Sequence, residues 1–530
     1  MPGSIFRFLC ETAERLPQKI AITSKTRSVT FAELRDEALA TAECFRELGV
    51  KPGDRVGICM EKTLDQISAI LGVLFANAVL VPILPRLKRS NIRHIIENSE
   101  MAFLVTDSER LNEVAEFADI TKLVTGHGEL DEERPNLPYL RRFLQPRMLS
   151  DRIGADNAAI IYSSGSTGRP KGILISHRNL ADGAEIVAEY LDTNESDRIG
   201  CVLSFNFDYG LNQIWQTLFK GATLCLHDLA LPNDLFAFLA EESITALPVM
   251  PVIITKMFDR RLKLATDSYD FSHLRYVCST GGRLSQDMLT DLKSTFPTAK
   301  IYSMFGLTEA FRSTYLDPTK IESHPTSIGK AIPDCQVLVL DENGNECAPH
   351  IIGELVHRGA TVTKGYWRDP VNTAKVFRSH PSFPGETLVF SGDKVIRDEE
   401  GYLYFVARGD EMIKTKGFRV SPTEVEAEVV RHPDIGAAVA FAVPNIAIGE
   451  DVACAYTTIN GQPLAETTLK QFLKSNLPNH MVPAYLIHFE TFPITGNDGK
   501  LDRKAIKEGA FEQLGIERDK GVAISFGQGT

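Results

Sequence analysis

One glycine-rich segment carries residue types suited to holding a polyphosphate. Residues 162–172 read Tyr-Ser-Ser-Gly-Ser-Thr-Gly-Arg-Pro-Lys-Gly, between the apolar runs 158–161 and 173–175. Small residues let backbone N–H groups approach phosphate oxygens, and hydroxyl and ammonium groups add donors and charge. The spacing is not that of a Walker loop, and the flanks predict two strands rather than a strand and a helix. We predict a phosphate-binding loop between two buried strands, formed by Ser163, Ser164, Gly165, Ser166, Thr167, Gly168 and Lys171.

A second segment, Met304-Phe-Gly-Leu-Thr-Glu309, combines an aromatic ring, a hydroxyl and a carboxylate. Phe305 can stack on a purine base, and Thr308 can donate a hydrogen bond to an α-phosphate. Glu309 offers the hard oxygen ligands that Mg²⁺ prefers. This set predicts that a nucleotide and its metal ion bind at the segment.

Taken in order along nearly the whole chain, these segments resemble motifs of the adenylate-forming (AMP-binding) enzyme superfamily. That superfamily contains acyl- and aryl-CoA ligases, the amino-acid-activating domains of peptide synthetases, and firefly luciferase. The resemblance implies an ATP- and Mg²⁺-dependent enzyme that activates a carboxylic acid as an acyl-adenylate. It implies as partners the acid and a phosphopantetheine thiol, carried by CoA or by a separate carrier protein.

The resemblance also assigns the remaining nucleotide contacts. The segment 279–284, Ser-Thr-Gly-Gly-Arg-Leu, is similar to one that lines the adenine pocket, which implies Gly281, Gly282 and Arg283 as contacts. The turn at Asp393 is similar to one whose carboxylate accepts both ribose hydroxyls, and Arg408 matches an arginine that contacts the nucleotide. The segments Gly353-Glu-Leu and Gly365-Tyr-Trp match structural stretches of the superfamily, and we assign them no chemistry.

The resemblance also implies roles for two positions near the C-terminus, one in domain motion and one in catalysis. Asp410 matches the hinge between the superfamily's two domains. Lys500, on the polar turn Asn497-Asp-Gly-Lys-Leu-Asp-Arg503, matches the catalytic lysine. With Thr308, Glu309 and Lys171, this lysine would neutralise the charge that develops on the α-phosphate.

The acid pocket is where the sequence leaves alternatives open. The same resemblance implies a mostly polar lining, formed by Phe207, Asp208, Tyr209, Asn212, Cys278, Thr280, Met304 and Arg312. Asp208 falls where amino-acid-activating domains hold the substrate's α-ammonium group, whereas Phe207 matches the aromatic gate of acyl- and aryl-CoA ligases. Arg312 is either a structural ion-pair partner or a contact to a second acceptor on the substrate.

Three functions therefore remain open. The first is an acyl or aryl ligase that makes a thioester. The second is a stand-alone amino-acid-adenylating enzyme that loads a separate carrier protein. The third is a nucleotide-binding protein without catalysis, which the intact motifs disfavour.

The bulk composition fits these functions and excludes others. A chain of 530 residues is too long for one hydrophobic core, so two or more domains are expected. The formal net charge of −12 argues against a nucleic-acid partner, which would need a basic face. Nine cysteines without paired spacing predict reduced thiols and a cytoplasmic location. We expect neither a secretory signal nor a membrane span, because Ser68, Asn77 and Pro82 interrupt the most apolar stretch.

The elements that must position these residues alternate along the chain. Strand-like runs at 55–59, 103–105, 159–162, 223–226 and 276–278 alternate with helical patterns such as 31–48, and residues 67–84 predict a buried helix feeding a strand. This alternation predicts an α/β fold with largely parallel stacked sheets, followed from about residue 334 by a β-rich subdomain. We place a large domain at 1–409 and a small, mobile α+β domain at 410–530, with a capped helix start at Ser421-Pro-Thr-Glu424.

Overall fold

The computed structural model describes two compact units, residues 1–337 with 356–391, and residues 338–355 with 392–530. Within the chain, the described residues are 4–85, 87, 89–107, 122–127, 136–142, 153–163, 170–228, 232–259, 266–282, 284–409, 411–415, 418–445, 449–495 and 500–516. The predicted boundary between residues 409 and 410 stays a prediction.

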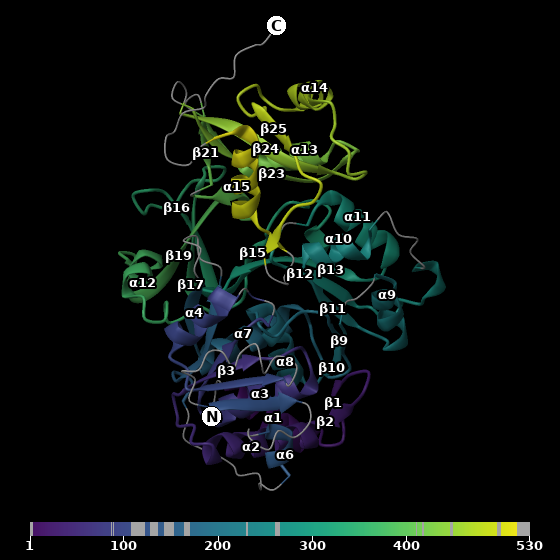
Figure 1. Cartoon of the computed structure of the whole chain (residues 1–530), viewed down its shortest axis with the longest axis vertical. Helices are drawn as coiled ribbons and strands as arrows, with labels where there is room; N and C mark the ends of the chain where they lie inside the picture. Colours follow the sequence, from purple (N-terminus) through teal and green to yellow (C-terminus); the bar gives the residue numbers. More distant parts are fainter. Residues whose placement is uncertain are drawn as a thin grey trace. The chain divides into compact units, whose positions relative to one another are not determined.

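A nine-stranded sheet forms one layer of the first unit (Figure 1). Its inner strands β1, β9, β10, β11, β12 and β13 are parallel, and antiparallel strands flank them. In spatial order the strands are β15 (Lys330–Ala331), β14 (Ala310–Leu316), β13 (Lys300–Leu307), β12 (Tyr276–Ser279), β11 (Ala246–Val249), β9 (Arg198–Cys201), β10 (Thr223–Leu226), β1 (Ile20–Thr23) and β2 (Ser28–Thr30).

A six-stranded sheet forms a second layer of the same unit. Its strands are parallel except for the antiparallel pair β7 and β8. In spatial order they are β6 (Lys122–His127), β5 (Phe103–Asp107), β3 (Arg55–Cys59), β4 (Val79–Pro82), β7 (Asn157–Ser163) and β8 (Lys171–Ser176). The predicted strands 55–59 and 223–226 match their observed bounds, which confirms the sequence pattern there.

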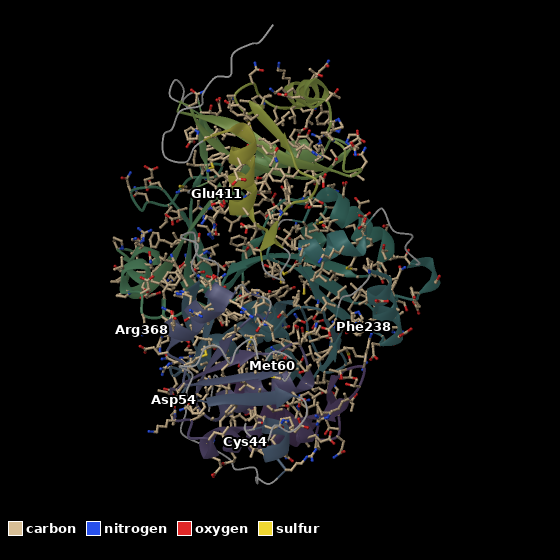
Figure 2. All side chains as sticks on the ribbon, in the orientation of Figure 1. Cys44, Asp54, Met60, Phe238, Arg368 and Glu411 are labelled. Carbon is tan, nitrogen blue, oxygen red and sulfur yellow. The ribbon has the colours of Figure 1, made fainter. Side chains whose placement is uncertain are left out.

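Helices lie between these sheets and on their outer faces. α7 packs on β7, β8 and β14, so it contacts both sheets, and α8 packs on β9 and β10. The helices of this unit are α1 (Ile5–Arg15), α2 (Phe31–Glu47), α3 (Leu64–Phe75), α4 (Arg89–Ser99), α6 (Leu137–Leu140), α7 (His177–Tyr190), α8 (Asp208–Lys220), α9 (Pro232–Glu241), α10 (Pro251–Met257), α11 (Gln286–Thr295) and α12 (Pro370–Val376). Figure 2 labels Cys44 on α2 and Met60 after β3, and both side chains are buried.

The apolar stretch 67–84 is the predicted buried helix and strand, α3 followed by β4. Every residue of β4 is buried. Among the residues that the structure describes, no helix combines the length and apolar character that a bilayer span requires. All nine cysteines are free thiols.

The predicted β-rich subdomain is a five-stranded sheet. It contains β16 (Cys335–Leu340), β17 (Gly353–Gly359), β19 (Phe383–Arg397), β18 (Phe377–His380) and β20 (Leu403–Arg408). The boundary between the two units falls within β16, β17 and β19.

The C-terminal residues form an α+β layer whose sheet is covered on both faces. Along β23 (Ile435–Asn445) and β24 (Gly449–Thr458), alternate residues face two separate apolar clusters. Helices α13 (Pro422–Val430) and α14 (Glu466–Asn476) cover one face, and α15 (Arg503–Leu514) covers the other. The other strands are β21 (Ile413–Thr415), β22 (Phe418–Val420) and β25 (Tyr485–His488), and β26 (Ile494–Thr495) pairs with β27 (Lys500–Leu501).

The predicted helix start at Ser421 is observed. Ser421 is the N-cap of α13, Pro422 is its first residue, and the backbone N–H of Glu424 donates to Ser421 Oγ over 3.4 Å. That bond is one half of the predicted capping box.

Candidate active site

The predicted phosphate loop connects the two antiparallel strands β7 and β8. Ser163 is paired with Lys171 across this hairpin, and Tyr162 is paired with Gly172. This arrangement confirms that the loop joins two strands. Gly172 is required there, because a Cβ atom would lie 2.7 Å from Ile160. Ser164, Gly165, Ser166, Thr167 and Gly168 lie outside the described residues, so their phosphate contacts stay predictions.

Lys171 and Glu309 contact the same tyrosine, Lys171 over the ring and Glu309 at the hydroxyl. The Lys171 ammonium lies 5.4 Å from the centre of the Tyr366 ring, within range of a cation–π contact. The Tyr366 hydroxyl donates to Glu309 Oε1 over 2.7 Å. The ring also packs edge-on against Phe377, with 5.6 Å between ring centres. Tyr366 therefore couples two predicted catalytic side chains that come from different sheets.

Glu309 is held on the tight turn of the β13–β14 hairpin. Leu307 and Ala310 are paired across this turn, so Thr308 and Glu309 are its two connecting residues. Thr363 fixes the Glu309 backbone, since both its N–H and its hydroxyl donate to the Glu309 carbonyl over 3.0 Å. The turn thus presents one hydroxyl and one carboxylate from a rigid backbone.

A bulge in the same hairpin positions Arg312. The register of the β13–β14 pair shifts between Phe305 and Leu307. Arg312, on the partner strand, has a φ of 62°, which is uncommon for a residue other than glycine. Gly306 faces it, and a Cβ atom at Gly306 would lie 3.0 Å from the Arg312 backbone. The bulge therefore directs a long cationic side chain into the buried region beside the hairpin.

The predicted acid-pocket residues meet around this arginine. Arg312 Nη1 lies 3.9 Å from Asp208 Oδ2, and the guanidinium lies 4.6 Å from the centre of the Tyr209 ring. The Tyr209 hydroxyl donates to the Cys278 carbonyl over 2.8 Å. Asp208 begins helix α8, and a Cβ atom at Gly210 would lie 1.9 Å from the Ser204 carbonyl oxygen, so only glycine fits there. Residues from α8, β12 and β14 thus lie close together, and their role as an acid pocket stays a prediction.

Burial raises the pKa of two side chains among these residues, Cys278 and Tyr209. Desolvation raises the pKa of the Cys278 thiol to about 12, although the Tyr209 hydrogen bond and Arg312 oppose the shift. Desolvation likewise raises the pKa of the Tyr209 hydroxyl well above its usual value. We therefore expect Cys278 to line the pocket as a small apolar group rather than as a nucleophile.

The other predicted pocket residues occupy the same part of the unit. Met304 on β13 accepts a hydrogen bond at its sulfur from the Tyr190 hydroxyl over 3.0 Å. Thr280 is buried directly after β12, and the exposed Gly281 and Gly282 follow it. Phe207, at the N-cap of α8, is partly exposed. Arg283 lies outside the described residues, and the predicted adenine contacts stay predictions.

The predicted ribose and hinge residues belong to the second unit. Asp393 on β19 is paired in register with Arg408 on β20, and Arg408 Nε donates to Asp393 Oδ1 over 2.9 Å. The sequence predicts a turn at Asp393, but Asp393 lies within β19, where Glu354 accepts from the preceding Gly392 N–H over 3.0 Å. Asp410 lies outside the described residues. For Lys500 the structure describes the backbone, which begins β27 opposite Thr495.

Two tyrosines that contact predicted site residues were not themselves predicted: Tyr366 contacts Glu309, and Tyr190 contacts Met304. Tyr366 belongs to the segment Gly365-Tyr-Trp, which was assigned no chemistry, and Tyr190 lies at the end of α7. Neither position has a local pattern that distinguishes it from a core aromatic residue. The one signal in the sequence was a tyrosine, Tyr366, directly after a glycine, Gly365. In the structure Gly365 has a φ of 109°, which favours glycine.

The donor set around Glu309 fits Mg²⁺ held jointly with a nucleotide. No group of three or more His, Cys, Asp or Glu side chains among the described residues could hold a metal ion by itself. Mg²⁺ is commonly bound through one or two carboxylates together with substrate phosphates. Because Tyr366 donates to Oε1 of Glu309, it orients this carboxylate, which could serve as such a ligand.

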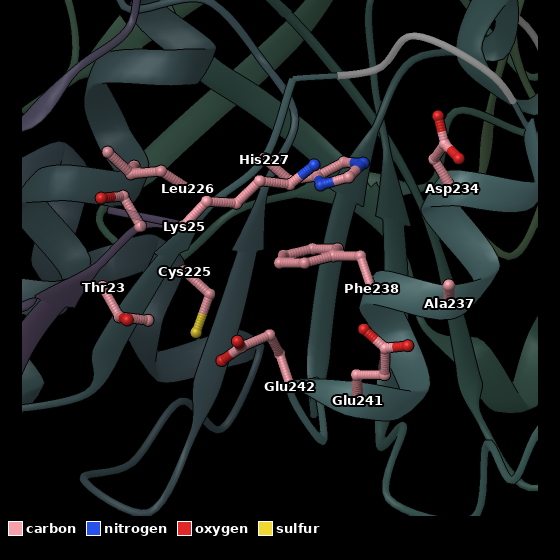
Figure 3. A pocket seen from close by; sticks show the side chains of 11 residues that line it. Thr23, Lys25, Cys225, Leu226, His227, Asp234, Ala237, Phe238, Glu241 and Glu242 are labelled. Atoms are coloured by element: carbon pink, nitrogen blue, oxygen red, sulfur yellow. The ribbon is translucent and has the colours of Figure 1, made fainter. Parts of the chain in front are cut away.

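A separate pocket lies at the ends of β1 and β10, beneath α9 (Figure 3). His227 stacks on Phe238 within it, with 4.4 Å between ring centres, and Lys25, Asp234 and Glu242 line its polar side. Desolvation and the nearby lysines lower the pKa of His227. None of the predicted site residues lines this pocket.

Comparison with known proteins gives matches along the chain. Residues 9–367 match the sequence model of the AMP-binding enzyme family, and residues 424–498 match that of the AMP-binding enzyme C-terminal domain. A component of the linear gramicidin synthase of Brevibacillus parabrevis is 30% identical over 96% of this chain and 10% of its own length. The dimodular nonribosomal peptide synthase of Bacillus subtilis (strain 168) is 29% identical over 92% of this chain and 21% of its own.

The chain therefore spans less than a quarter of the length of these two curated relatives. Among solved structures, ATP-bound MatB from Rhodopseudomonas palustris superposes with a TM-score of 0.87 at 24% identity, covering 97% of this chain and 100% of MatB. This likeness shows the fold, and it agrees with the predicted α/β architecture of a large and a small domain.

Proposed function

The chain belongs to the AMP-binding enzyme family, and from this premise we propose that it activates a carboxylic acid with ATP as an acyl-adenylate. The membership confirms the predicted family, and it supports the predicted class, an AMP-forming acid–thiol ligase. In the proposed reaction, a carboxylate oxygen attacks the α-phosphorus of ATP. The bond from that phosphorus to the oxygen bridging to the β-phosphate breaks, and pyrophosphate leaves.

The contact of Lys171, Tyr366 and Glu309 is the observation that carries this proposal. Carboxylate and ATP are both anionic, so the site must offset their repulsion while holding the reacting atoms in line. Lys171, at the base of the phosphate loop, supplies a positive charge 5.4 Å from the ring that orients Glu309. Mg²⁺, bound through Glu309 and the phosphates, would supply further positive charge.

The second half of the reaction transfers the acyl group to a thiol. The thiolate sulfur attacks the acyl carbon, and AMP leaves with the electron pair of the broken carbon–oxygen bond. We propose that the C-terminal domain rotates about Asp410 between the two halves, withdrawing Lys500 after adenylation. The acceptor is the phosphopantetheine thiol of CoA or of a separate carrier protein.

Pyrophosphate exchange into ATP tests the first half directly. The purified chain is incubated with ATP, Mg²⁺ and labelled pyrophosphate, together with single acids from a panel of aliphatic, aromatic and amino acids. We expect exchange with at least one acid, and we expect Glu309→Gln to reduce it for every acid that supports it. ATP binding without exchange on any acid would instead support a nucleotide-binding protein that does not catalyse.

Activation of an amino acid is the second candidate, because one of the curated relatives described above is a nonribosomal peptide synthase. In that case Asp208 would hold the α-ammonium group, and Asp208→Ala should abolish exchange with amino acids only. Its carboxylate, however, already lies 3.9 Å from the Arg312 guanidinium. A partly buried carboxylate that already has a cation beside it has less need of a substrate ammonium group.

A further inference from the structure

The Arg312 guanidinium has one unused edge among the residues predicted to line the acid pocket. The Arg312 residue is 3% exposed, and its Nε and Nη2 atoms have no hydrogen-bond partner among the described residues. Its ion pair with Asp208 involves Nη1, the nitrogen farthest from that edge, and the 3.9 Å separation is longer than a hydrogen bond. Tyr209 covers one face of the guanidinium.

The free edge has the geometry of a carboxylate site. Nε–H and Nη2–H of a guanidinium point in the same direction, so they can donate two parallel hydrogen bonds to the two oxygens of one carboxylate. Because Asp208 lies at the opposite nitrogen, it leaves this edge open. Buried donors without a partner are costly, which favours a ligand that pairs them.

Asn212 adds a second unpaired polar group to the same region. It lies one helical turn after Asp208, on the same face of α8. Its side chain is fully buried, and neither its Oδ1 nor its Nδ2 atom is hydrogen-bonded within the described part of the chain. The region thus combines a charged fork and an amide, whereas an aliphatic or unsubstituted aromatic acid would leave both without a partner.

We propose that the substrate is a dicarboxylic acid whose second carboxylate binds the Nε/Nη2 edge of Arg312, while its first carboxylate is adenylated. This inference rests on the proposed function and names its substrate class. Arg312 is then a specificity-determining residue, and Asp208 serves mainly to orient the guanidinium from its far side.

Matched pairs of acids in the exchange assay test the proposal. Each straight-chain diacid from three to six carbons is compared with the monoacid of equal length, and each benzenedicarboxylic acid with benzoic acid. Aspartic and glutamic acids are compared with alanine and 2-aminobutyric acid. We expect kcat/KM to be at least ~100-fold higher for the best diacid than for its partner, as for other sites built around a substrate's polar group.

Variants at Arg312 separate this inference from the proposed function. Arg312→Met should reduce the diacid preference by at least ~10-fold, and Arg312→Lys should restore it only in part, since an ammonium group lacks the fork. Because Arg312→Met leaves the partly buried Asp208 carboxylate without its cation, the double variant Asp208→Asn/Arg312→Met serves as a neutral background. It should lose the diacid preference equally.

The outcomes are distinguishable. Exchange that favours monoacids, or a diacid preference that survives Arg312→Met, overturns the dicarboxylate inference and leaves adenylation standing. If neutral amino acids support exchange and this exchange is lost in Asp208→Ala, the dicarboxylate inference is also overturned while adenylation stands. Absence of exchange with every acid overturns the proposed function and this inference together.

Discussion

The two parts of the candidate site treat their polar groups in opposite ways. Around Glu309 the polar side chains satisfy each other, since Tyr366 donates to the carboxylate and Thr363 holds its backbone. Around Arg312 several buried polar atoms are unpaired, since Nε and Nη2 of Arg312 and both polar atoms of Asn212 have no partner among the described residues. The first region is held in place by its own side chains, whereas the second keeps buried donors that the proposed substrate would pair.

This difference indicates which region serves the reaction with ATP for every acid and which region selects the acid. A self-satisfied network keeps its geometry whichever acid is bound, which suits a reaction with ATP that is common to every substrate. Unpaired buried groups select among ligands, because the wrong ligand leaves them without a partner. Changes near Glu309 should therefore affect all acids equally, whereas changes near Arg312 should change the order of preference.

Replacement of Lys500 should have the largest effect of the changes that act on all acids equally. Replacing Lys500 by Ala should slow adenylation of every acid by at least ~10²–10³, the range for removing one preorganised charge-stabilising group. Transfer to the thiol from a preformed acyl-adenylate should be far less affected, because Lys500 is proposed to leave the site first. Rapid-quench measurement of the two half-reactions distinguishes them, and equal losses in both would refute the proposed rotation about Asp410.

His357 on β17 shows how much stability a buried side chain without a hydrogen-bond partner costs at a position away from the candidate site. Its ring is buried without a hydrogen-bond partner among the described residues, and desolvation lowers its pKa from 6.5 to about 3. Between these values the unfolded chain binds a proton that the folded chain does not, so stability is full above pH 6.5 and declines as the pH falls toward 3. At pH 5 the loss is about 2 kcal/mol.

Urea unfolding of wild type and His357→Leu at pH 7 and pH 5 measures this contribution. Between pH 7 and pH 5, the free energy of unfolding should fall by about 2 kcal/mol less in the variant than in the wild type. His273→Leu is the matched control, because the His273 side chain is exposed. If both variants keep the wild-type pH dependence, the burial of His357 carries no such penalty.

A pair of Tyr→Phe variants gives the smallest effect and the most direct comparison of the two regions. Tyr366→Phe keeps the ring beneath Lys171 and removes the hydrogen bond to Glu309, so kcat/KM should fall about 5- to 10-fold for all acids alike. Tyr190→Phe removes the hydrogen bond to Met304 in the acid pocket, and it should change the ratio between acids. Equal behaviour of the two variants across the acid panel would contradict the proposed division.

Much of the fold could be predicted because its signals are local. The strands 55–59 and 223–226 and the helix starting at residue 31 follow from runs of apolar residues and from capping. The β7–β8 hairpin follows from two apolar runs on either side of a Gly/Ser loop. The partner of Glu309 could not be predicted in this way, because Tyr366 is 57 residues away and lies beside a different sheet.

The sequence by itself determined the α/β layers and the family motifs, because a motif needs only fixed spacing along the chain, and from these motifs it predicts the residues that approach ATP. Tertiary structure decided which side chains meet. The left-handed backbone at Arg312 arises from a register shift between two strands, and it brings the guanidinium to Asp208 on a distant helix. Which edge of Arg312 stays unpaired depends on packing in three dimensions, and that edge is what the proposed choice of acid rests on.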